Sequence, residues 1–239
     1  MSSLDFNYIN SLYLEILSPL VKWKILDLKT LHEEGSYTHH IKSFRKLIAR
    51  FEKGGIIKSF RDPWTGKKFV YLTRDGEDMI SPEDSRLIIT RWNLMHAAKV
   101  SEISKSLLNL EMVRDVIVNH DLDEDKKELG EDATLVCQKE DFTFNIAFRF
   151  VITRSKKQDV IDEIRHLLYK KKFEFIVYLF CMPNIYEAYK EIILEKFGAR
   201  GSSKVLLFYS QTIISREIDL NIGEGFFNNA PKSFYDVFY

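Results

Sequence analysis

Basic side chains are concentrated in one segment of the chain, between Tyr37 and Arg74. Ten lysines and arginines fall in this segment and only two acids, Glu52 and Asp62, oppose them, so it carries a net 10 − 2 = +8 charges. The whole chain of 239 residues has 35 basic and 35 acidic side chains, and its net charge is zero. A local excess of this size attracts a polyanion such as a nucleic acid, and a solvated charged face is the alternative interpretation.

The opposite excess lies further along, between Glu111 and Asp141. Eleven acids and four bases in this segment give 4 − 11 = −7 charges. Residues 121–132 have little apolar content, which predicts an exposed loop. Such a loop can mimic DNA and shield a basic face, or dock a partner, but an acidic run of this kind is more often simply solvated.

Three helices are predicted to precede and carry the basic segment. Apolar residues at helical spacing predict a first helix over residues 8–25, which Pro19 bends or ends. Asp27 is expected to cap a short second helix over residues 28–34. A third helix is predicted over residues 38–53, with an apolar inner stripe and a basic outer face.

A β-hairpin is predicted directly after the third helix. Its strands are expected at residues 56–60 and 67–72, and Pro63 and Gly66 supply the turn between them. Three helices followed by a hairpin, with basic charge on the third helix and on the hairpin, is typical of a winged helix. In that arrangement the third helix enters the major groove of DNA and the hairpin contacts the backbone or the minor groove.

The predicted DNA contacts therefore lie at the start of the third helix, along its outer face and on the hairpin. The lysines and arginines are expected mainly to neutralise phosphates, and the polar side chains near the helix start are expected to face the bases. At the hairpin tip, stacking on DNA and stabilising the turn are equally good interpretations of Trp64. The predicted contacts are Tyr37, Thr38, His39, His40, Lys42, Ser43, Arg45, Lys46, Arg50, Lys58, Arg61, Trp64, Lys67 and Lys68.

The second part of the chain is predicted to be a mixed sheet with helices packed on it. Two continuous apolar runs, residues 175–181 and 205–209, suit buried central strands. The aromatic tail from Phe226 to Tyr239 has no clear period and is left without a prediction. In chain order the predicted elements are a helix at 99–116, strands at 133–137 and 142–153, a helix at 158–170, a strand at 173–181, a helix at 185–197 and a strand at 204–209.

Several short motifs follow one another in an order that resembles a known family. After the predicted winged helix come the pair Met95-His96, then Asp132-Ala133 opening a strand, then a long strand ending in Thr153-Arg154-Ser155-Lys156. This order resembles the plasmid replication-relaxation proteins, which include the MobC-type mobilisation proteins of conjugative plasmids, over residues 8–210. The resemblance implies a second domain of the PD-(D/E)XK nuclease type. It also implies a role at an origin of transfer or replication.

The nuclease chemistry of that family needs carboxylates that hold Mg²⁺ or Mn²⁺. Asp132 matches the first acid of the family pattern, but the paired glutamates of the pattern fall on Arg149 and Val151. Because a lone carboxylate beside an arginine is a poor cation site, we expect Asp132 to be vestigial and the fold to persist without catalysis. Glu140, Asp141 and Glu174 are the acids left to rebuild a site, although their spacing does not favour one.

A second, weaker basic cluster lies around the end of the long strand. Arg149, Arg154, Lys156 and Lys157 are predicted to contact DNA that flanks the first site. Arg165 and the lysines at 170–172 belong to the same cluster, and a solvated helix end that suits the helix dipole explains the three lysines equally well.

Other chemistry has little support in the sequence. The six histidines and the lone Cys137 and Cys181 show no zinc-ligand spacing, and neither a phosphate-binding glycine loop nor a serine nucleophile elbow occurs. The two isolated cysteines favour a reducing cytoplasm, and no apolar run is long enough to span a membrane. No metal or other cofactor is expected unless the nuclease interpretation holds.

The sequence thus predicts an α+β protein with a winged helix at 1–80, a linker at 81–95 and a nuclease-like α/β domain at 96–239. The function we expect is binding of double-stranded DNA at an origin of transfer or replication, or at a promoter, without cutting. A metal-dependent endonuclease that nicks such an origin and a winged-helix protein–protein adaptor are the alternatives. A second copy of the chain and mobilisation or replication proteins are the further partners expected.

Overall fold

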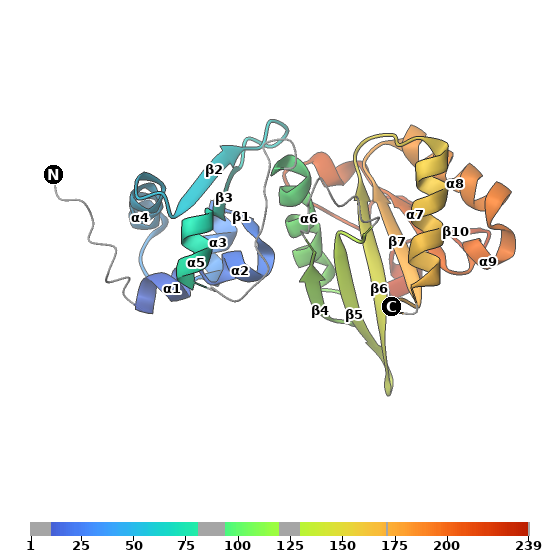
Figure 1. Cartoon of the computed structure of the whole chain (residues 1–239), viewed down its shortest axis with the longest axis horizontal. Helices are drawn as coiled ribbons and strands as arrows, with labels where there is room; N and C mark the ends of the chain where they lie inside the picture. Colours follow the sequence, from blue (N-terminus) through green and yellow to red (C-terminus); the bar gives the residue numbers. More distant parts are fainter. Residues whose placement is uncertain (1–10, 81–93, 120–129, 171, 239) are drawn as a thin grey trace. The chain divides into compact units, whose positions relative to one another are not determined.

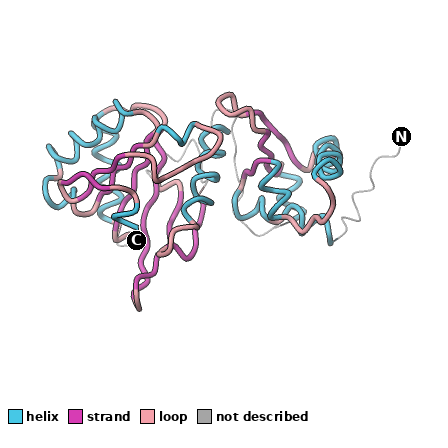
Figure 2. Tube along the Cα trace, turned by 180° about the vertical axis from the view of Figure 1, so that it is seen from behind, coloured by secondary structure: helices cyan, strands magenta, loops and turns pink. Residues whose placement is uncertain are grey.

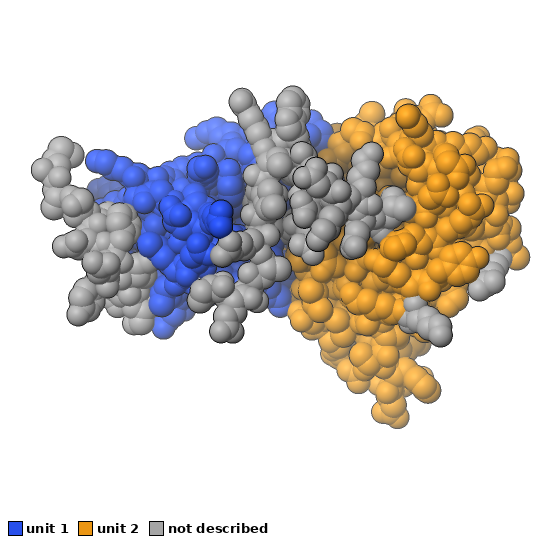
Figure 3. Space-filling model, in the orientation of Figure 1, with its two compact units in different colours: residues 1–101, 120–122 blue, residues 102–119, 123–239 orange. Residues whose placement is uncertain are grey.

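The computed structural model describes residues 11–80, 94–119, 130–170 and 172–238. It confirms a mixed α+β protein and divides into two compact units. Unit 1 comprises residues 1–101 and 120–122, and unit 2 comprises residues 102–119 and 123–239 (Figure 3). Of the predicted 81–95 linker, residues 81–93 lie outside the described residues, as does most of the acidic segment 121–132. None of the helices in the described ranges is both long and apolar enough to cross a bilayer.

Unit 1 places short helices around a small antiparallel sheet with the strand order β1-β3-β2 (Figure 1). The sheet pairs Ile25 with Tyr71 and Phe60 with Phe69. These four side chains share one face, and Ala97 and Ala98 pack against that face. The elements are α1 (Ser11–Leu17), α2 (Pro19–Trp23), β1 (Ile25–Asp27), α3 (Leu28–Glu34), α4 (Ile41–Lys53), β2 (Ile57–Arg61), β3 (Lys68–Leu72), α5 (Arg74–Ile80) and the start of α6 (Leu94–Leu107).

The local sequence explains most of the boundaries in unit 1. The single helix predicted over 8–25 is two helices, because Pro19 has no N–H to continue α1 and instead begins α2. Asp27 caps α3 as predicted, and its carboxylate accepts the backbone N–H groups of Lys29 and Thr30 at 2.9 and 3.3 Å. The third helix begins at Ile41 rather than at residue 38. Strand β1 was missed, since three residues are too few to show a period.

Unit 2 is a seven-stranded sheet in the order β10-β9-β8-β7-β6-β5-β4. Strands β6, β7 and β8 run parallel, and the outer pairs are antiparallel, which gives the predicted mixed sheet. The strands are β4 (Val113–Val118), β5 (Ala133–Lys139), β6 (Phe142–Val151), β7 (Phe175–Phe180), β8 (Val205–Tyr209), β9 (Glu224–Phe227) and β10 (Ala230–Lys232). The helices are α7 (Lys157–Tyr169), α8 (Pro183–Lys196), α9 (Gly198–Ser202), the 3₁₀ helix η1 (Gln211–Ile214) and α10 (Tyr235–Phe238).

The two faces of this sheet carry different cores. Helices α7 and α8 cover the face that carries Ala147, Tyr178 and Leu207 (Figure 1). On the opposite face the ring of Phe208 meets Phe234, which comes just before α10. The β5–β6 hairpin extends beyond the rest of the sheet, as the view from behind shows (Figure 2). The sheet therefore leaves that hairpin tip to solvent, and Phe142 is 76% exposed there.

The helix predicted over 99–116 is wrong in both its start and its end. The helix α6 starts earlier and ends at Leu107, and β4 follows from Val113 to Val118. Val113, Val116 and Val118 are buried in a β-branched run, which prefers the extended backbone. The unassigned tail forms β9, β10 and α10, elements of three or four residues that are too short to show periodicity.

The contribution of the Asp27 cap to stability can be tested by substitution. Replacing an N-cap aspartate by alanine leaves the first N–H groups of the helix without an acceptor and costs about 1 kcal/mol. We expect Asp27→Ala to lower the free energy of unfolding by that amount in urea titration, and Asp27→Asn, which keeps an oxygen acceptor, to lose much less. An equal loss of unfolding free energy in the two variants would show that Asp27 does not stabilise the protein by capping α3.

Candidate nucleic-acid interface

The helix α4 separates apolar and basic side chains cleanly. Phe44, Leu47, Ile48 and Phe51 are buried along its inner side. Gly54 and Gly55 end the helix, and Gly55 has a φ of +78°, which a glycine adopts without strain. The outer side is exposed and carries Lys42, Ser43, Arg45, Lys46, Arg50 and Lys53.

The cations on this outer side lack carboxylate partners. Within the described ranges, no ion pair involves any of the five cations Lys42, Arg45, Lys46, Arg50 and Lys53. Like charges four residues apart on a helix, as in Lys42–Lys46 and Lys46–Arg50, repel one another. The helix therefore gains nothing in stability from this arrangement, and a bound polyanion would offset the repulsion.

Unit 2 uses its lysines differently. Each of four lysines there lies 2.5 to 3.4 Å from a carboxylate oxygen, an ordinary arrangement for a solvated surface. The pairs are Lys157–Glu195, Lys170–Glu131, Lys190–Glu187 and Lys204–Glu174. On α4, by contrast, none of the five cations has a carboxylate partner among the described residues.

Glu52 is the acid of α4, and it faces the β2–β3 hairpin. Its carboxylate accepts hydrogen bonds from Lys68 at 2.8 Å and from the Ser59 hydroxyl. Burial alone would raise the pKa of Glu52, but these two donors more than offset it and leave the pKa lowered. Glu52 thus links α4 to the hairpin. Lys68, which was predicted to contact DNA, forms an ion pair with Glu52 in this link.

The hairpin continues the basic surface. Lys58 and Arg61 are exposed on β2, and the Arg61 guanidinium donates to the carbonyl of Gly66 at 3.2 Å. Lys67 is half-buried and Trp64 is 41% exposed at the tip. The hairpin therefore presents two exposed cations and one exposed aromatic ring.

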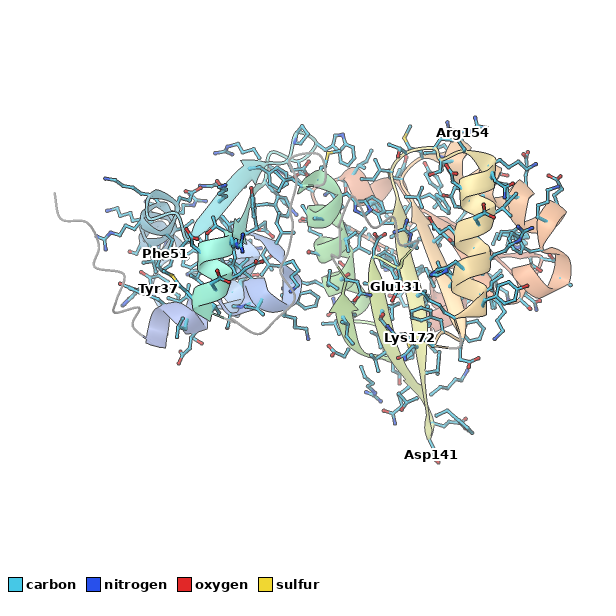
Figure 4. All side chains as sticks on the ribbon, in the orientation of Figure 1. Tyr37, Phe51, Glu131, Asp141, Arg154 and Lys172 are labelled. Carbon is cyan, nitrogen blue, oxygen red and sulfur yellow. The ribbon has the colours of Figure 1, made fainter. Side chains whose placement is uncertain are left out.

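The residues before α4 divide between packing and exposure. Tyr37, labelled in Figure 4, packs its ring against Phe44 and His32 at centroid distances of 5.4 and 6.1 Å, so it belongs to the local core. His40 caps the helix, since its Nδ1 accepts the Lys42 N–H at 3.2 Å. Thr38 and His39 are exposed. Of the predicted base-facing side chains, Tyr37 and His40 therefore have structural roles.

Unit 2 contains a largely buried charged cluster around Asp132, the acid that was expected to be vestigial. Arg149 donates to Asp132 at 3.0 Å and makes two bonds of 3.1 Å to the carboxylate of Glu163 on α7. Asp132 also accepts the Phe150 N–H at 2.7 Å, and Tyr178 donates its hydroxyl to Glu163 at 2.8 Å. The guanidinium thus bridges two carboxylates.

Electrostatics in this cluster favour the charged arginine. Burial alone would lower the pKa of Arg149, but Asp132 and Glu163 raise it well above its usual value. Burial, with Glu163 beside it, raises the pKa of Tyr178 well above its usual value, so the hydroxyl keeps its proton and donates. Arg149 is therefore committed inside unit 2 and is poorly placed for the DNA contact that was predicted for it.

The cluster does not suit a divalent cation. Both oxygens of Asp132 already accept hydrogen bonds, and a guanidinium stands where a cation would bind. Across the described segments, no group of three or more His, Cys, Asp or Glu side chains is arranged to hold a metal ion. Cys137 is a buried free thiol, and burial raises its pKa to about 12, which makes it a poor metal ligand.

Glu131, next to Asp132, belongs to a separate cluster. Its carboxylate lies 3.4 Å from both Lys170 and Lys172, and Figure 4 labels Glu131 and Lys172. Burial alone would raise the pKa of Glu131, and its own backbone N–H and the two lysines more than offset this and leave it lowered. These lysines therefore hold Glu131 instead of forming a freely solvated helix end.

The other members of the second basic cluster lie after β6. Arg154, labelled in Figure 4, and Lys156 are exposed and have no ion pair within the described residues. Lys157 is paired with Glu195. Among the described cations of this cluster, Arg154 and Lys156 are therefore the two without an ion pair.

Two residues that matter for these sites were missed in the sequence. Glu163 lies on the buried side of α7, between Val160 and Leu167, and an acid in an apolar helical stripe is the signal that would have found it. Lys99 is fully buried in α6 against Asp62, and its position among Ala97, Ala98 and Val100 carries the same signal.

Comparison of the chain with protein-family models, with curated proteins and with solved structures gave no significant match.

The bridging arginine generates a stability prediction. Removing one partner of a buried ion pair leaves uncompensated charge and costs about 3–5 kcal/mol. We expect Arg149→Met to lower the free energy of unfolding by that amount at neutral pH. Urea titration measures this loss. Arg165→Met, which removes an exposed ion pair with Asp162, is the matched control and should change the free energy of unfolding little.

Proposed function

We propose that this chain binds double-stranded DNA through α4 and the β2–β3 hairpin of unit 1, which act together as a winged helix. The observation that carries the proposal is the row of five α4 cations without carboxylate partners in the described part of the chain. Thirteen residues give α4 a length of about 20 Å, and an α-helix fits the major groove of B-DNA. Lys58, Arg61 and Trp64 are exposed on the hairpin, which the Glu52–Lys68 bond joins to α4.

We infer that contacts to phosphates dominate this binding. The exposed face of α4 offers four cations beyond Lys42, one hydroxyl and one methyl group, and its sequence contains neither asparagine nor glutamine to pair with adenine. Arg45, near the helix start, is the side chain best suited to a guanine edge. Affinity should therefore fall steeply with salt, with a modest preference among sequences.

We further propose that unit 2 is a nuclease-like domain that does not cut. Arg149 between Asp132 and Glu163 supports the absence of cutting, because a guanidinium bonded to both carboxylates competes with the metal ion that such chemistry requires. The resemblance to plasmid replication-relaxation and mobilisation proteins extends the proposal to an origin of transfer or replication, or a promoter. A metal-dependent endonuclease and a protein–protein adaptor are the outcomes that the following experiments would reveal instead.

A duplex-binding titration tests the main proposal. Fluorescence anisotropy with a labelled 40-base-pair duplex should show binding whose logarithmic salt slope is about 0.9 per neutralised phosphate. We expect the triple variant Arg45→Glu, Lys46→Glu and Arg50→Glu to abolish it. The variant Arg165→Glu, Lys190→Glu and Lys204→Glu makes the same change in net charge on unit 2 and should bind nearly as well. Equal effects of the two variants, or no binding by the unchanged protein, would favour the adaptor.

A plasmid-nicking assay tests the absence of cutting. The protein should leave supercoiled DNA intact with or without Mn²⁺, and Asp132→Asn should leave DNA affinity nearly unchanged. Nicking that needs Mn²⁺ and disappears in Asp132→Asn would establish the endonuclease alternative.

The second basic cluster has its own test. Arg154→Glu with Lys156→Glu should weaken binding to a long duplex less than the α4 variant does, because these two exposed cations only add flanking phosphate contacts. Anisotropy with duplexes of two lengths measures this. An equal loss on the short duplex would place Arg154 and Lys156 in the primary site.

A further inference from the structure

The tip of the β2–β3 hairpin is built around a buried carboxylate. Asp62 is 1% exposed although it lies in a six-residue connection between two strands. One oxygen accepts the Trp64 N–H at 3.0 Å, and the other accepts the Thr65 hydroxyl at 2.5 Å. The backbone closes the turn with bonds from Asp62 to Lys67 at 3.0 Å and from Gly66 to Asp62 at 2.8 Å. The side chain and backbone of Asp62 together therefore hold Trp64, Thr65, Gly66 and Lys67 of the tip by hydrogen bonds.

A second buried charge supports this carboxylate from α6. The ammonium of Lys99 lies 3.6 Å from Asp62 Oδ2, and the Lys99 side chain is fully buried. Both residues belong to unit 1, where Ala97 and Ala98 of the same helix pack on Phe69 of β3. The helix thus places a cation beneath an otherwise exposed turn.

Stability alone is a poor reason for this arrangement. The free energy of removing two charges from water is about as large as the free energy of their attraction. Apolar side chains of similar volume would therefore stabilise the turn at least as well. The ion pair instead fixes the orientation of the Asp62 carboxylate. In that one orientation the carboxylate lies beside Lys99 and accepts hydrogen bonds from the Thr65 hydroxyl and the Trp64 N–H. Trp64 at the tip is therefore 41% exposed, while its backbone is held by the buried Asp62 carboxylate.

We propose that Lys99 and Asp62 are positioning residues for DNA binding, which hold the hairpin tip so that Trp64 contacts the duplex. This inference rests on the proposed function and adds a contact that α4 does not make. An indole ring packs on sugar and base surfaces independently of sequence, and Arg61 beside it reaches a phosphate. Neither Lys99 nor Asp62 touches the DNA in this arrangement.

A double-mutant cycle tests the positioning role. We expect Lys99→Met and Trp64→Ala each to weaken duplex binding about tenfold, and the double variant to be little worse than Trp64→Ala alone, because Lys99 acts through Trp64. In the full chain, duplex binding should also change the fluorescence of the unchanged protein, and Trp64→Phe should reduce that change. Additive losses, or wild-type affinity in Lys99→Met, would overturn the inference.

A second variant tests the inference if circular dichroism shows that Lys99→Met does not fold. Thr65→Val keeps the side-chain shape and removes one hydrogen bond to Asp62, so it should weaken DNA binding in the same direction by a smaller factor. Unchanged affinity in Thr65→Val would then overturn the inference. Loss of binding in the α4 triple variant together with unaffected tip variants would retain the proposed function and reject the positioning role alone.

Discussion

The ion bridge of Arg149 holds together the elements on which unit 2 depends. Its guanidinium joins Asp132, just before β5, to Glu163 on α7, and Arg149 itself lies near the end of β6. Tyr178 on β7 completes the bridge through Glu163, so four neighbouring elements meet at one set of hydrogen bonds. A low-dielectric interior makes such a network strong only when every member has its partner, which constrains all four residues at once.

Unit 1 handles charge in the opposite way. Its cations on α4 remain exposed and unmatched within the described chain, whereas Glu52 and Asp62, the acids of the same segment, turn inward to support the hairpin. The two acids therefore do not neutralise the exposed cations of α4. Charge separation of this kind favours association with a polyanion at the expense of internal pairing.

Predictability followed the strength of local signals. The Asp27 cap, the amphipathic α4 and the apolar strands β7 and β8 were evident in the sequence, because capping chemistry and periodicity are local. The helix predicted over 99–116 failed because apolar valines continued its pattern into β4. The partners of Arg149 and Asp62 could not be predicted, since Glu163 and Lys99 approach them only through tertiary packing. The outer face of α4 was predictable, but its lack of ion pairs required the structure.

The course of α6 has a practical meaning for anyone who dissects the chain. A fragment that stops at residue 80, where a hairpin and its short following helix end, omits Ala97, Ala98 and Lys99. Such a fragment would expose the apolar side of the small sheet at Ile25 and Phe69 and leave Asp62 without its buried cation. A fragment that keeps these contacts therefore extends at least to Ser101, and it ends inside α6 instead of in a loop.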